Sequence, residues 1–442
     1  MSILFNILKE KIFMRTLIFS SFVLILLSLN FCRKDPSSLN DYTIELTAES
    51  VECTDAWLSL KADNIKDGIN LLVKRDTVTI YNSRFNKTDT LLHDSGLTPN
   101  TEYDYSAYFL NNNVQTGEIG LTVTTMDTTG HNFTWQVYDF GGGSSSILND
   151  IAIIDENDIW AVGSISTAEG RYNAVHWDGA KWELTKVPYI YQNQQYVHPL
   201  NFCFHLDNQV YFGGNGMVIW TGYEFKNLEI SSDLWGPNEI NKMWGISIQN
   251  LNIVGNNGSI ARYNGQEWTK IESGTELDIQ DIWGSWNEST GEYEILCVAS
   301  NYGERESQLL GIEDGLVKHL DLKGLTYSLD GIWFKSGKKY FIGGGSGIKI
   351  NNVNIKDNPW IIYSHDPINY FYIFDIAAND INDVIAVGGH GGIMHYNGTS
   401  WKNYIDETAF YGNLTGVDMK GDLIAAAGYT DWSGRILIGK RN

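Results

Sequence analysis

The sequence contains little proline and little cysteine, and it lacks the pattern of a long amphipathic helix beyond residue 40. Proline occurs 7 times and cysteine 4 times in 442 residues. After Cys32 the cysteines are Cys53, Cys203 and Cys297, an odd number without the spacing of zinc ligands. We therefore expect buried thiols, no structural disulfide and no zinc site.

The sequence also lacks catalytic, metal-binding and nucleotide-binding motifs, so we expect no cofactor. Its glycine clusters are not phosphate-binding loops, because none of them opens a helical pattern. Basic residues are scarce as well: 31 lysines and arginines stand against 53 aspartates and glutamates, a formal net charge of −22. This charge repels nucleic-acid phosphates and anionic lipids, so neither is an expected partner.

Glycine and tryptophan are abundant instead. The chain has 44 glycines and 15 tryptophans, a balance typical of a turn-rich β protein with large side chains between its sheets. Residues 149–187 contain four short strand-like runs. The last two runs are joined by Asp178-Gly179, a dipeptide that favours the tight turn between adjacent antiparallel strands.

This plan recurs to the C-terminus. The second run of each copy ends in a small residue, and these residues are spaced roughly 40–50 positions apart, as in propellers built from four-stranded blades. Seven copies predict a seven-bladed β-propeller over residues 131–442. The small residues are Gly163, Gly214, Gly255, Ser300, Gly343, Gly388 and Gly428.

The seventh copy has only three strand-like runs before the chain ends at Asn442. Residues 133–140, FTWQVYDF, have the pattern of the missing fourth strand. We therefore predict that residues 134–139 pair into the last blade, so that the ring closes without an exposed sheet edge. Four tryptophans within strands are predicted to pack between blades: Trp160, Trp244, Trp283 and Trp333.

The N-terminus has the features of a signal peptide. Three basic residues precede an apolar run over 17–29, which is too short to favour a membrane-spanning helix. The run leads into Leu29-Asn30-Phe31-Cys32, which resembles a bacterial lipobox. That resemblance implies that residues 1–31 are removed and that Cys32 is lipidated, with residues 32–40 as a tether.

Two alternatives remain at this end of the chain. Phe31 differs from the small residue expected before a lipidated cysteine, so cleavage nearby without lipidation is one of them; a start at Met14 is the other. By resemblance to lipoprotein sorting signals, Arg33-Lys34-Asp35 favours the outer membrane. We expect a lipid-anchored bacterial protein on its periplasmic or cell-surface side.

Residues 41–126 have no propeller landmarks and contain about seven short strand-like runs with turns between them, as in a β-sandwich. The stretch Leu97-Thr98-Pro99-Asn100-Thr101-Glu102-Tyr103 resembles the fibronectin type III motif, in which the tyrosine hydroxyl ties a corner between strands. Trp57 is expected in the core of this domain. The resemblance implies a spacer between the membrane and the propeller, or a folding appendage.

In propellers the loops between blades and those between second and third strands lie on one face, around the channel mouth. The longer of these loops carry aromatic and polar residues, which suit a sugar ring or an extended peptide unless the loops pack on themselves. His390 lies in a glycine-rich turn on the same face. The candidate ligand-binding residues are Trp235, Tyr302, Arg305, Trp360, His365, Asp366, Tyr429, Asp431 and Trp432.

The hairpin pattern resembles kelch and Asp-box propellers, but it lacks the serine two residues before the aspartate that marks an Asp-box. Nearly the whole mature chain resembles a family of bacterial lipoproteins with a fibronectin-like domain before such a propeller. This resemblance implies no residue-level function. We expect a monomeric, non-enzymatic protein that presents this face to a glycan or protein ligand. The alternative is a carbohydrate-active enzyme with two facing carboxylates, drawn from Glu304, Glu306, Asp366 and Asp431.

A redox-cofactor propeller is a weaker third option, since no matching motif is present. An enzyme would place a buried pair of carboxyl groups with raised pKa values at the channel mouth, whereas a binding protein would place an open aromatic surface there.

Overall fold

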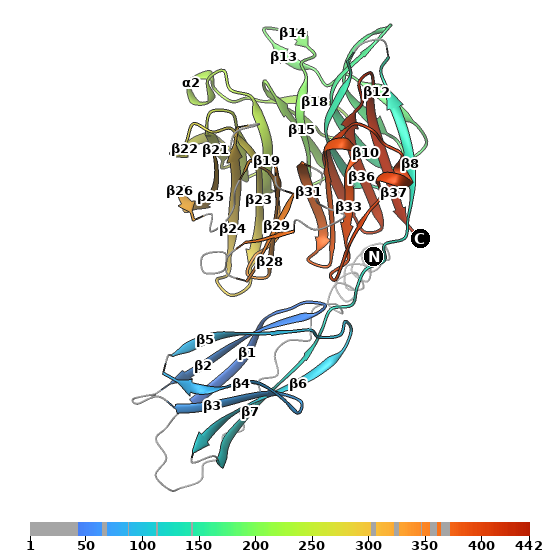
Figure 1. The fold of residues 1–442 in the computed structure, drawn as a ribbon. Helices are drawn as coiled ribbons and strands as arrows, with labels where there is room; N and C mark the ends of the chain where they lie inside the picture. The colour runs from blue at the N-terminus through green and yellow to red at the C-terminus, as the bar shows by residue number, and fades with distance from the viewer. Residues whose placement is uncertain are drawn as a thin grey trace, which may run out of the picture. The chain divides into compact units, whose positions relative to one another are not determined.

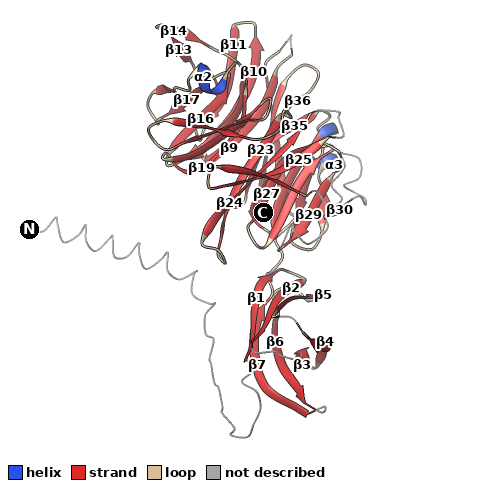
Figure 2. Cartoon of the chain, turned by 90° about the vertical axis from the view of Figure 1, so that its left-hand side faces the viewer, coloured by secondary structure: helices blue, strands red, loops and turns tan. Residues whose placement is uncertain are grey.

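The computed structural model describes residues 43–63, 69–86, 88–111, 114–142, 145–301, 306–321, 327–345, 347–353, 360–363 and 372–442. The chain divides into two compact units, Met1–Thr43 and Ile44–Asn442, and every described element beyond Thr43 lies in the second. Strands account for almost all of its regular structure (Figure 2). The predicted signal peptide, Cys32 and the tether lie outside the described residues. No helix of the described part is both long and apolar enough to span a membrane.

Residues 43–124 form two antiparallel sheets, in agreement with the expected sandwich. One sheet has the order β1-β2-β5 and the other the order β4-β3-β6-β7. The strands are β1 (Thr43–Val51), β2 (Asp55–Asp63), β3 (Ile69–Arg75), β4 (Val78–Phe85), β5 (Asp89–Ser95), β6 (Glu102–Asn111) and β7 (Val114–Thr124).

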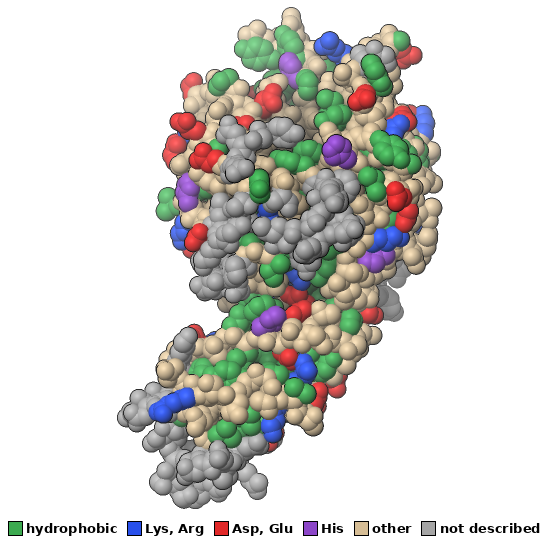
Figure 3. All heavy atoms as spheres, viewed as in Figure 1, with side chains coloured by type: hydrophobic (Ala, Val, Ile, Leu, Met, Phe, Trp, Pro, Cys, Tyr) green, Lys and Arg blue, Asp and Glu red, His purple; other side chains and the backbone are tan. Residues whose placement is uncertain are grey.

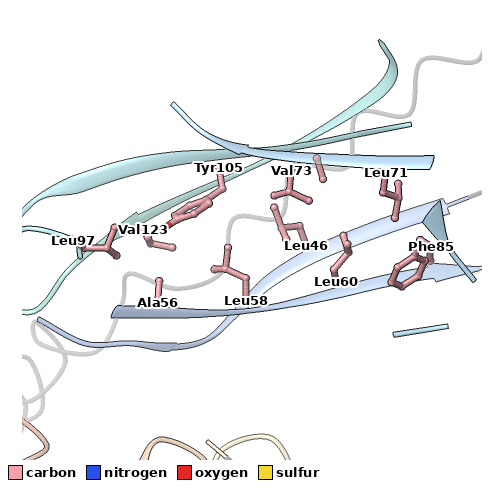
Figure 4. Packing of buried hydrophobic residues seen from close by; sticks show 12 residues of the cluster. Leu46, Ala56, Leu58, Leu60, Leu71, Val73, Phe85, Leu97, Tyr105 and Val123 are labelled. Carbon is pink, nitrogen blue, oxygen red and sulfur yellow. The ribbon is translucent and has the colours of Figure 1, made fainter. Parts of the chain in front are cut away.

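The core of these two sheets is apolar, with one buried polar connection. Leu58, Leu60 and Val73 are fully buried and point into the space between the sheets (Figure 4). Tyr105 lies among them and donates its hydroxyl to Asp94 at 2.7 Å, and Asp94 also pairs with Arg75 at 2.8 Å. The buried hydroxyl therefore has a partner, which removes the penalty of burying it alone.

The corner before β6 has the predicted hydrogen bond: the Thr98 backbone N–H donates to the Tyr103 hydroxyl at 2.9 Å. The expectation for Trp57 is wrong. Alternate residues of a strand point to opposite faces, and Ala56 and Leu58 occupy the core-facing positions of β2. Trp57 lies on the other face, only partly buried, and stacks on His93 with ring centroids 4.0 Å apart.

In the described part of residues 133–442, seven four-stranded antiparallel sheets follow one another. The first three are β9–β12 (Ile147–Asp155, Asp158–Thr167, Gly170–Trp177, Trp182–Thr185), β15–β18 (Leu200–Leu206, Gln209–Gly214, Met217–Trp220, Phe225–Leu228) and β19–β22 (Ile240–Ser247, Asn250–Gly255, Ser259–Tyr263, Trp268–Glu272). The next two are β23–β26 (Ile279–Asn287, Glu292–Ser300, Ser307–Glu313, Leu316–Leu320) and β27–β30 (Leu329–Lys335, Lys339–Gly344, Ile348–Asn352, Ile361–Tyr363).

The sixth sheet is β31–β34 (Ile373–Asp380, Asp383–Gly388, Ile393–Tyr396, Trp401–Asn403). The seventh has the order β35-β36-β37-β8 (Asn413–Lys420, Leu423–Tyr429, Gly434–Arg441, Phe133–Phe140). Short elements join the sheets: the hairpin β13–β14 (Tyr189–Tyr191, Gln194–Tyr196) and the helices α2 (Ser232–Trp235) and α3 (Ile405–Thr408). A single turn, η1 (Gly389–Gly391), connects β32 to β33 within the sixth sheet.

The first strands of successive sheets pack against one another and close a ring. Each of β9, β15, β19, β23, β27 and β31 contacts the first strand of the next sheet, and β35 contacts β9. The prediction for the closing strand is confirmed: β8 pairs with β37 in one register from Phe133 opposite Arg441 to Phe140 opposite Gly434 (Figure 1). The last sheet thus has four strands although its members come from both ends of the ring segment.

The buried thiols and the tryptophans in the strands also match expectation. Cys53, Cys203 and Cys297 are free and buried. Trp160, Trp244 and Trp333 are at most 5% exposed, and Trp283 packs against the hydrophobic clusters between sheets three and four, four and five, and five and six. Rings of this size fill the space between neighbouring sheets. A single sheet could not bury both of its faces without a neighbour on each side.

The recurring small residue has a steric reason. In the second strand of six sheets a glycine faces a carbonyl oxygen at the start of the first strand, or of the residue just before it, so closely that a Cβ atom would collide with that oxygen. The register corrects two sequence assignments. Gly344, not Gly343, and Ala299, not Ser300, occupy the position that Gly388 occupies in the sixth sheet.

Gly388→Ala should therefore destabilise the ring. The added Cβ would meet the Tyr372 carbonyl oxygen, and relieving such overpacking costs about 1–3 kcal/mol. Gly142→Ala is the control, because no atom lies within 4 Å of the Cβ position there. Urea unfolding of both variants measures the difference; equal midpoints would contradict this explanation.

Candidate functional site

The inner strands of the ring are tied together by side chains that repeat from sheet to sheet. Each first strand has a β-bulge near its start, and in four sheets the bulged residue reaches the next sheet. Three asparagines and one threonine donate in this way to first-strand carbonyl oxygens: Asn149 to Leu200 (2.8 Å), Asn201 to Ile240 (3.1 Å), Asn241 to Ile279 (3.0 Å) and Thr415 to Leu148 (2.7 Å).

Aspartates next to the bulges accept hydrogen bonds from the neighbouring sheet. Asp150 accepts from the Cys203 N–H at 3.1 Å, Asp281 from the Ile332 N–H at 2.8 Å and Asp375 from the Val417 N–H at 3.0 Å. All three carboxyl groups are buried. Burial raises the pKa of Asp150 and of Asp281, although Lys242 and the backbone donors oppose the rise.

Lys242 lies among these aspartates at the same register position of the third sheet. Its Nζ is 3.0 Å from Asp150 Oδ1 and 3.4 Å from Asp375 Oδ2, and those residues belong to sheets one and six. Burial alone would lower the pKa of Lys242, but the three aspartates raise it well above its ordinary value. The lysine therefore bridges sheets that are not neighbours.

This charge cluster ties the inner strands of the ring together. Asp150, Asp281 and Asp375 each accept from backbone N–H groups, and Lys242 lies between them. The described residues contain no group of three or more His, Cys, Asp or Glu side chains placed to hold a metal ion.

An open pocket of about 320 Å³ lies between the sixth and seventh sheets. Three chain segments form it: the β32–β33 turn, the segment leading into β35 and the β36–β37 turn. Its lining residues are His390, Tyr411, Gly412, Asn413, Tyr429, Thr430 and Asp431.

Close backbone packing fixes these three segments. Gly391 N–H donates to Gly412 O at 2.6 Å. A Cβ at Gly391 would collide with the Phe410 carbonyl oxygen, and one at Gly412 with the Tyr429 carbonyl oxygen, so side chains are excluded at both positions. Phe410 is fully buried beneath them. The pocket is therefore formed before any ligand arrives, which lowers the entropic penalty of binding.

The rim of the pocket is aromatic and exposed. Tyr411 is 78% exposed, and Trp432, next in the chain to the lining residue Asp431, is 70% exposed. Asp431 and Trp432 occupy the tip of a turn closed by a hydrogen bond from Thr430 N–H to Ser433 O at 2.9 Å. His390 has φ of 55° and ψ of 27°, a left-handed conformation that few residues other than glycine adopt.

The nine predicted binding residues fall into three groups. Tyr429 and Asp431 line the pocket and Trp432 adjoins it. Trp235 and Trp360 are only 7% and 6% exposed and belong to the cores of their sheets, so the expectation of exposed rings is wrong for both. Trp235 also donates its Nε1–H to Asn238 O at 2.8 Å. The other four lie outside the described residues: Tyr302, Arg305, His365 and Asp366.

Sequence reasoning missed Tyr411 and Asn413. Tyr411 could have been found, because it is an aromatic residue in a loop between two copies of the repeat. Asn413 had no signal of its own, because its place in the pocket depends on the packing of the sixth sheet against the seventh. Its Nδ2 donates to the Tyr429 hydroxyl at 2.9 Å.

The chain matches no protein-family model and no curated protein. Among solved structures, one described as "YCF48 bound to D1 peptide" is 18% identical, with a TM-score of 0.52 over 71% of this chain and 97% of that one. A second, YCF48 from Cyanidioschyzon merolae, is 15% identical, with a TM-score of 0.49 over 70% and 98%. At these identities the similarity concerns the fold alone, and residues 133–442 thus have a β-propeller-like fold.

Proposed function

We propose that this chain is a non-enzymatic binding protein whose pocket between the last two sheets receives a glycan or protein ligand. In this proposal residues 43–124 are a fibronectin type III-like domain and the ring is a seven-bladed β-propeller. Cys32 carries the lipid that anchors the protein at the outer membrane, and the membrane is contacted through that lipid alone.

The architectural part rests on strand order and on the closed ring. The sheets β1-β2-β5 and β4-β3-β6-β7, with the Thr98–Tyr103 hydrogen bond at the corner, agree with a fibronectin type III-like arrangement. Seven four-stranded sheets whose first strands contact in a closed series agree with seven blades.

One observation carries the binding part: a preformed pocket with largely exposed rings at its rim and a single carboxylate in its lining. Exposed aromatic rings beside a few polar groups suit recognition, because they supply apolar area without strong directional demands. The similar structure with a bound D1 peptide makes a protein ligand compatible with this fold.

A glycosidase remains the second candidate, and the pocket gives it little support. Two facing carboxylates about 5–10 Å apart would be needed. Asp431 is the single carboxylate among the lining residues, and Glu306 belongs to the turn between β24 and β25 in the fourth sheet. The other two candidate acids, Glu304 and Asp366, lie outside the described residues.

Tyr411→Ala and Trp432→Ala should each weaken retention of a ligand by roughly 5- to 30-fold, the usual effect of removing an exposed aromatic anchor, about 1–2 kcal/mol. The measurement is retention of the full-length protein on a combined glycan and peptide array, with product release followed in the same wells. Tyr223→Ala is the matched control, since Tyr223 is 76% exposed on the turn between β17 and β18. Unchanged retention in both rim variants would refute this choice of pocket, and product release would favour the enzyme.

A further inference from the structure

We infer that the pocket between the sixth and seventh sheets takes a cationic group, the guanidinium or ammonium of a basic side chain in a protein ligand. This inference rests on the proposed function and specifies the chemistry of its ligand.

The lining combines aromatic rings with an acid. Tyr411 and Tyr429 are aromatic lining residues of the pocket, and Asp431 is its negatively charged lining residue. A cation near an aromatic face is attracted by the ring quadrupole, and a carboxylate adds a charge-assisted hydrogen bond. A neutral sugar would use the rings but would gain less from the carboxylate.

The carboxylate of Asp431 has no basic partner among the described residues. The nearest basic side chain in the sequence, Arg435, is already paired with Asp139. Its guanidinium also lies 5.7 Å from the centroid of the Phe410 ring, beneath the pocket. No lysine or arginine is among the described residues that line the pocket, so a ligand cation would meet a carboxylate without an ion-pair partner there.

Asn413 and Thr430, two of the other polar residues of the lining, already have hydrogen-bond partners. Asn413 Nδ2 donates to the Tyr429 hydroxyl at 2.9 Å, and Thr430 Oγ1 lies 3.1 Å from Ser433 Oγ. Two of the groups that could have served an anion or a sugar as donors are therefore already engaged. Asp431, which can only accept while ionised, is the charged group left for a ligand.

The net charge of the whole chain also favours a cationic ligand. The formal net charge is −22, which attracts cationic partners and speeds their association at low ionic strength. On the face drawn in Figure 3, basic side chains are scattered singly among acidic ones. A volume of about 320 Å³ suits one long side chain.

The test uses the full-length protein on an array of peptides that are identical except for one central residue: arginine, citrulline, lysine or acetyl-lysine. Arginine and citrulline have similar shape but differ in charge. We expect retention on the arginine and lysine peptides to exceed that on their neutral counterparts by roughly 10-fold or more, the scale of a charge-assisted bond with an adjoining ring. Added salt should reduce this preference.

Asp431→Asn should remove most of that preference and keep the shape of the side chain. Asp314→Asn is the control, because Asp314 is a turn aspartate between β25 and β26 in the fourth sheet. Equal retention of arginine and citrulline, or a preference that survives Asp431→Asn, would overturn the inference. If the protein retains neutral glycans and Tyr411→Ala abolishes that retention, the cation inference is overturned but the proposed function is upheld. If neither Tyr411→Ala nor Trp432→Ala changes retention on any probe, both the inference and the proposed function are contradicted.

Discussion

Lys242→Met is expected to lower the free energy of unfolding by about 3–5 kcal/mol, the usual result of removing one partner from a buried ionic group. Asp150 and Asp375 would keep their buried positions without the cation that lies 3.0 and 3.4 Å from them. Methionine nearly preserves the volume of the side chain, so the loss would come from charge and not from a cavity. Because the lysine joins sheets one, three and six, the whole ring should unfold at lower denaturant concentration.

Two comparisons separate this explanation from a general effect of losing a lysine. Lys181→Met removes an exposed pair with Glu183, whose side chains are 66% and 48% exposed, and should leave the unfolding midpoint nearly unchanged. Adding Asp150→Asn to Lys242→Met should recover part of the loss, because one uncompensated carboxylate is removed. Chemical unfolding measures all three; a loss below 1 kcal/mol for Lys242→Met would show that the cluster does not stabilise the ring.

Phe133→Ala should destabilise the closing strand by about 3–5 kcal/mol, the range for truncating a buried phenylalanine. Phe133 is 7% exposed at the start of β8. Its ring centroid lies 5.2 Å from that of His395 and 5.9 Å from that of Tyr404, and the Arg441 guanidinium lies 5.0 Å from it. These contacts fix β8 to the sixth sheet and to the end of β37, so their loss should free the edge of the last sheet.

Val137→Ala is the control in the same strand, because Val137 is 42% exposed and its truncation should alter stability by less than about 1 kcal/mol. Limited proteolysis between residues 126 and 140 provides a second measurement. Faster cleavage there in Phe133→Ala than in Val137→Ala would support closure of the ring by this strand. Equal cleavage and equal stability would contradict it.

The ring could be predicted from the sequence because its signals are local and repeated. Alternation in strands and the Asx-Gly turns set the four-stranded plan, and the missing fourth strand in the last copy directed attention to residues 133–140. The same regularity could have revealed the inner ties, since Asn149, Asn201 and Asn241 recur at one position. Lys242 could not have been assigned its role, because its partners Asp150 and Asp375 are 92 and 133 residues away in the chain.

The candidate site was harder to predict, because burial of a loop side chain depends on what packs over it. Trp235 and Trp360 look like Trp432 in the sequence, yet two are buried and one is 70% exposed. The prediction that Trp57 is buried was wrong for a related reason. Alternation shows that β2 has two faces, but it does not show which face packs against the other sheet. Tyr429 ends a strand and Asp431 lies in the tight turn that follows it; both line the pocket, and their role in binding stays a prediction.

The most direct test is a crystal structure of the full-length protein with the array peptide that it retains most strongly. We predict a basic side chain of the peptide between Tyr411 and Tyr429, with its nitrogen atoms within hydrogen-bond distance of the Asp431 carboxylate. A peptide bound elsewhere on the protein, with this pocket holding only solvent, would contradict the account.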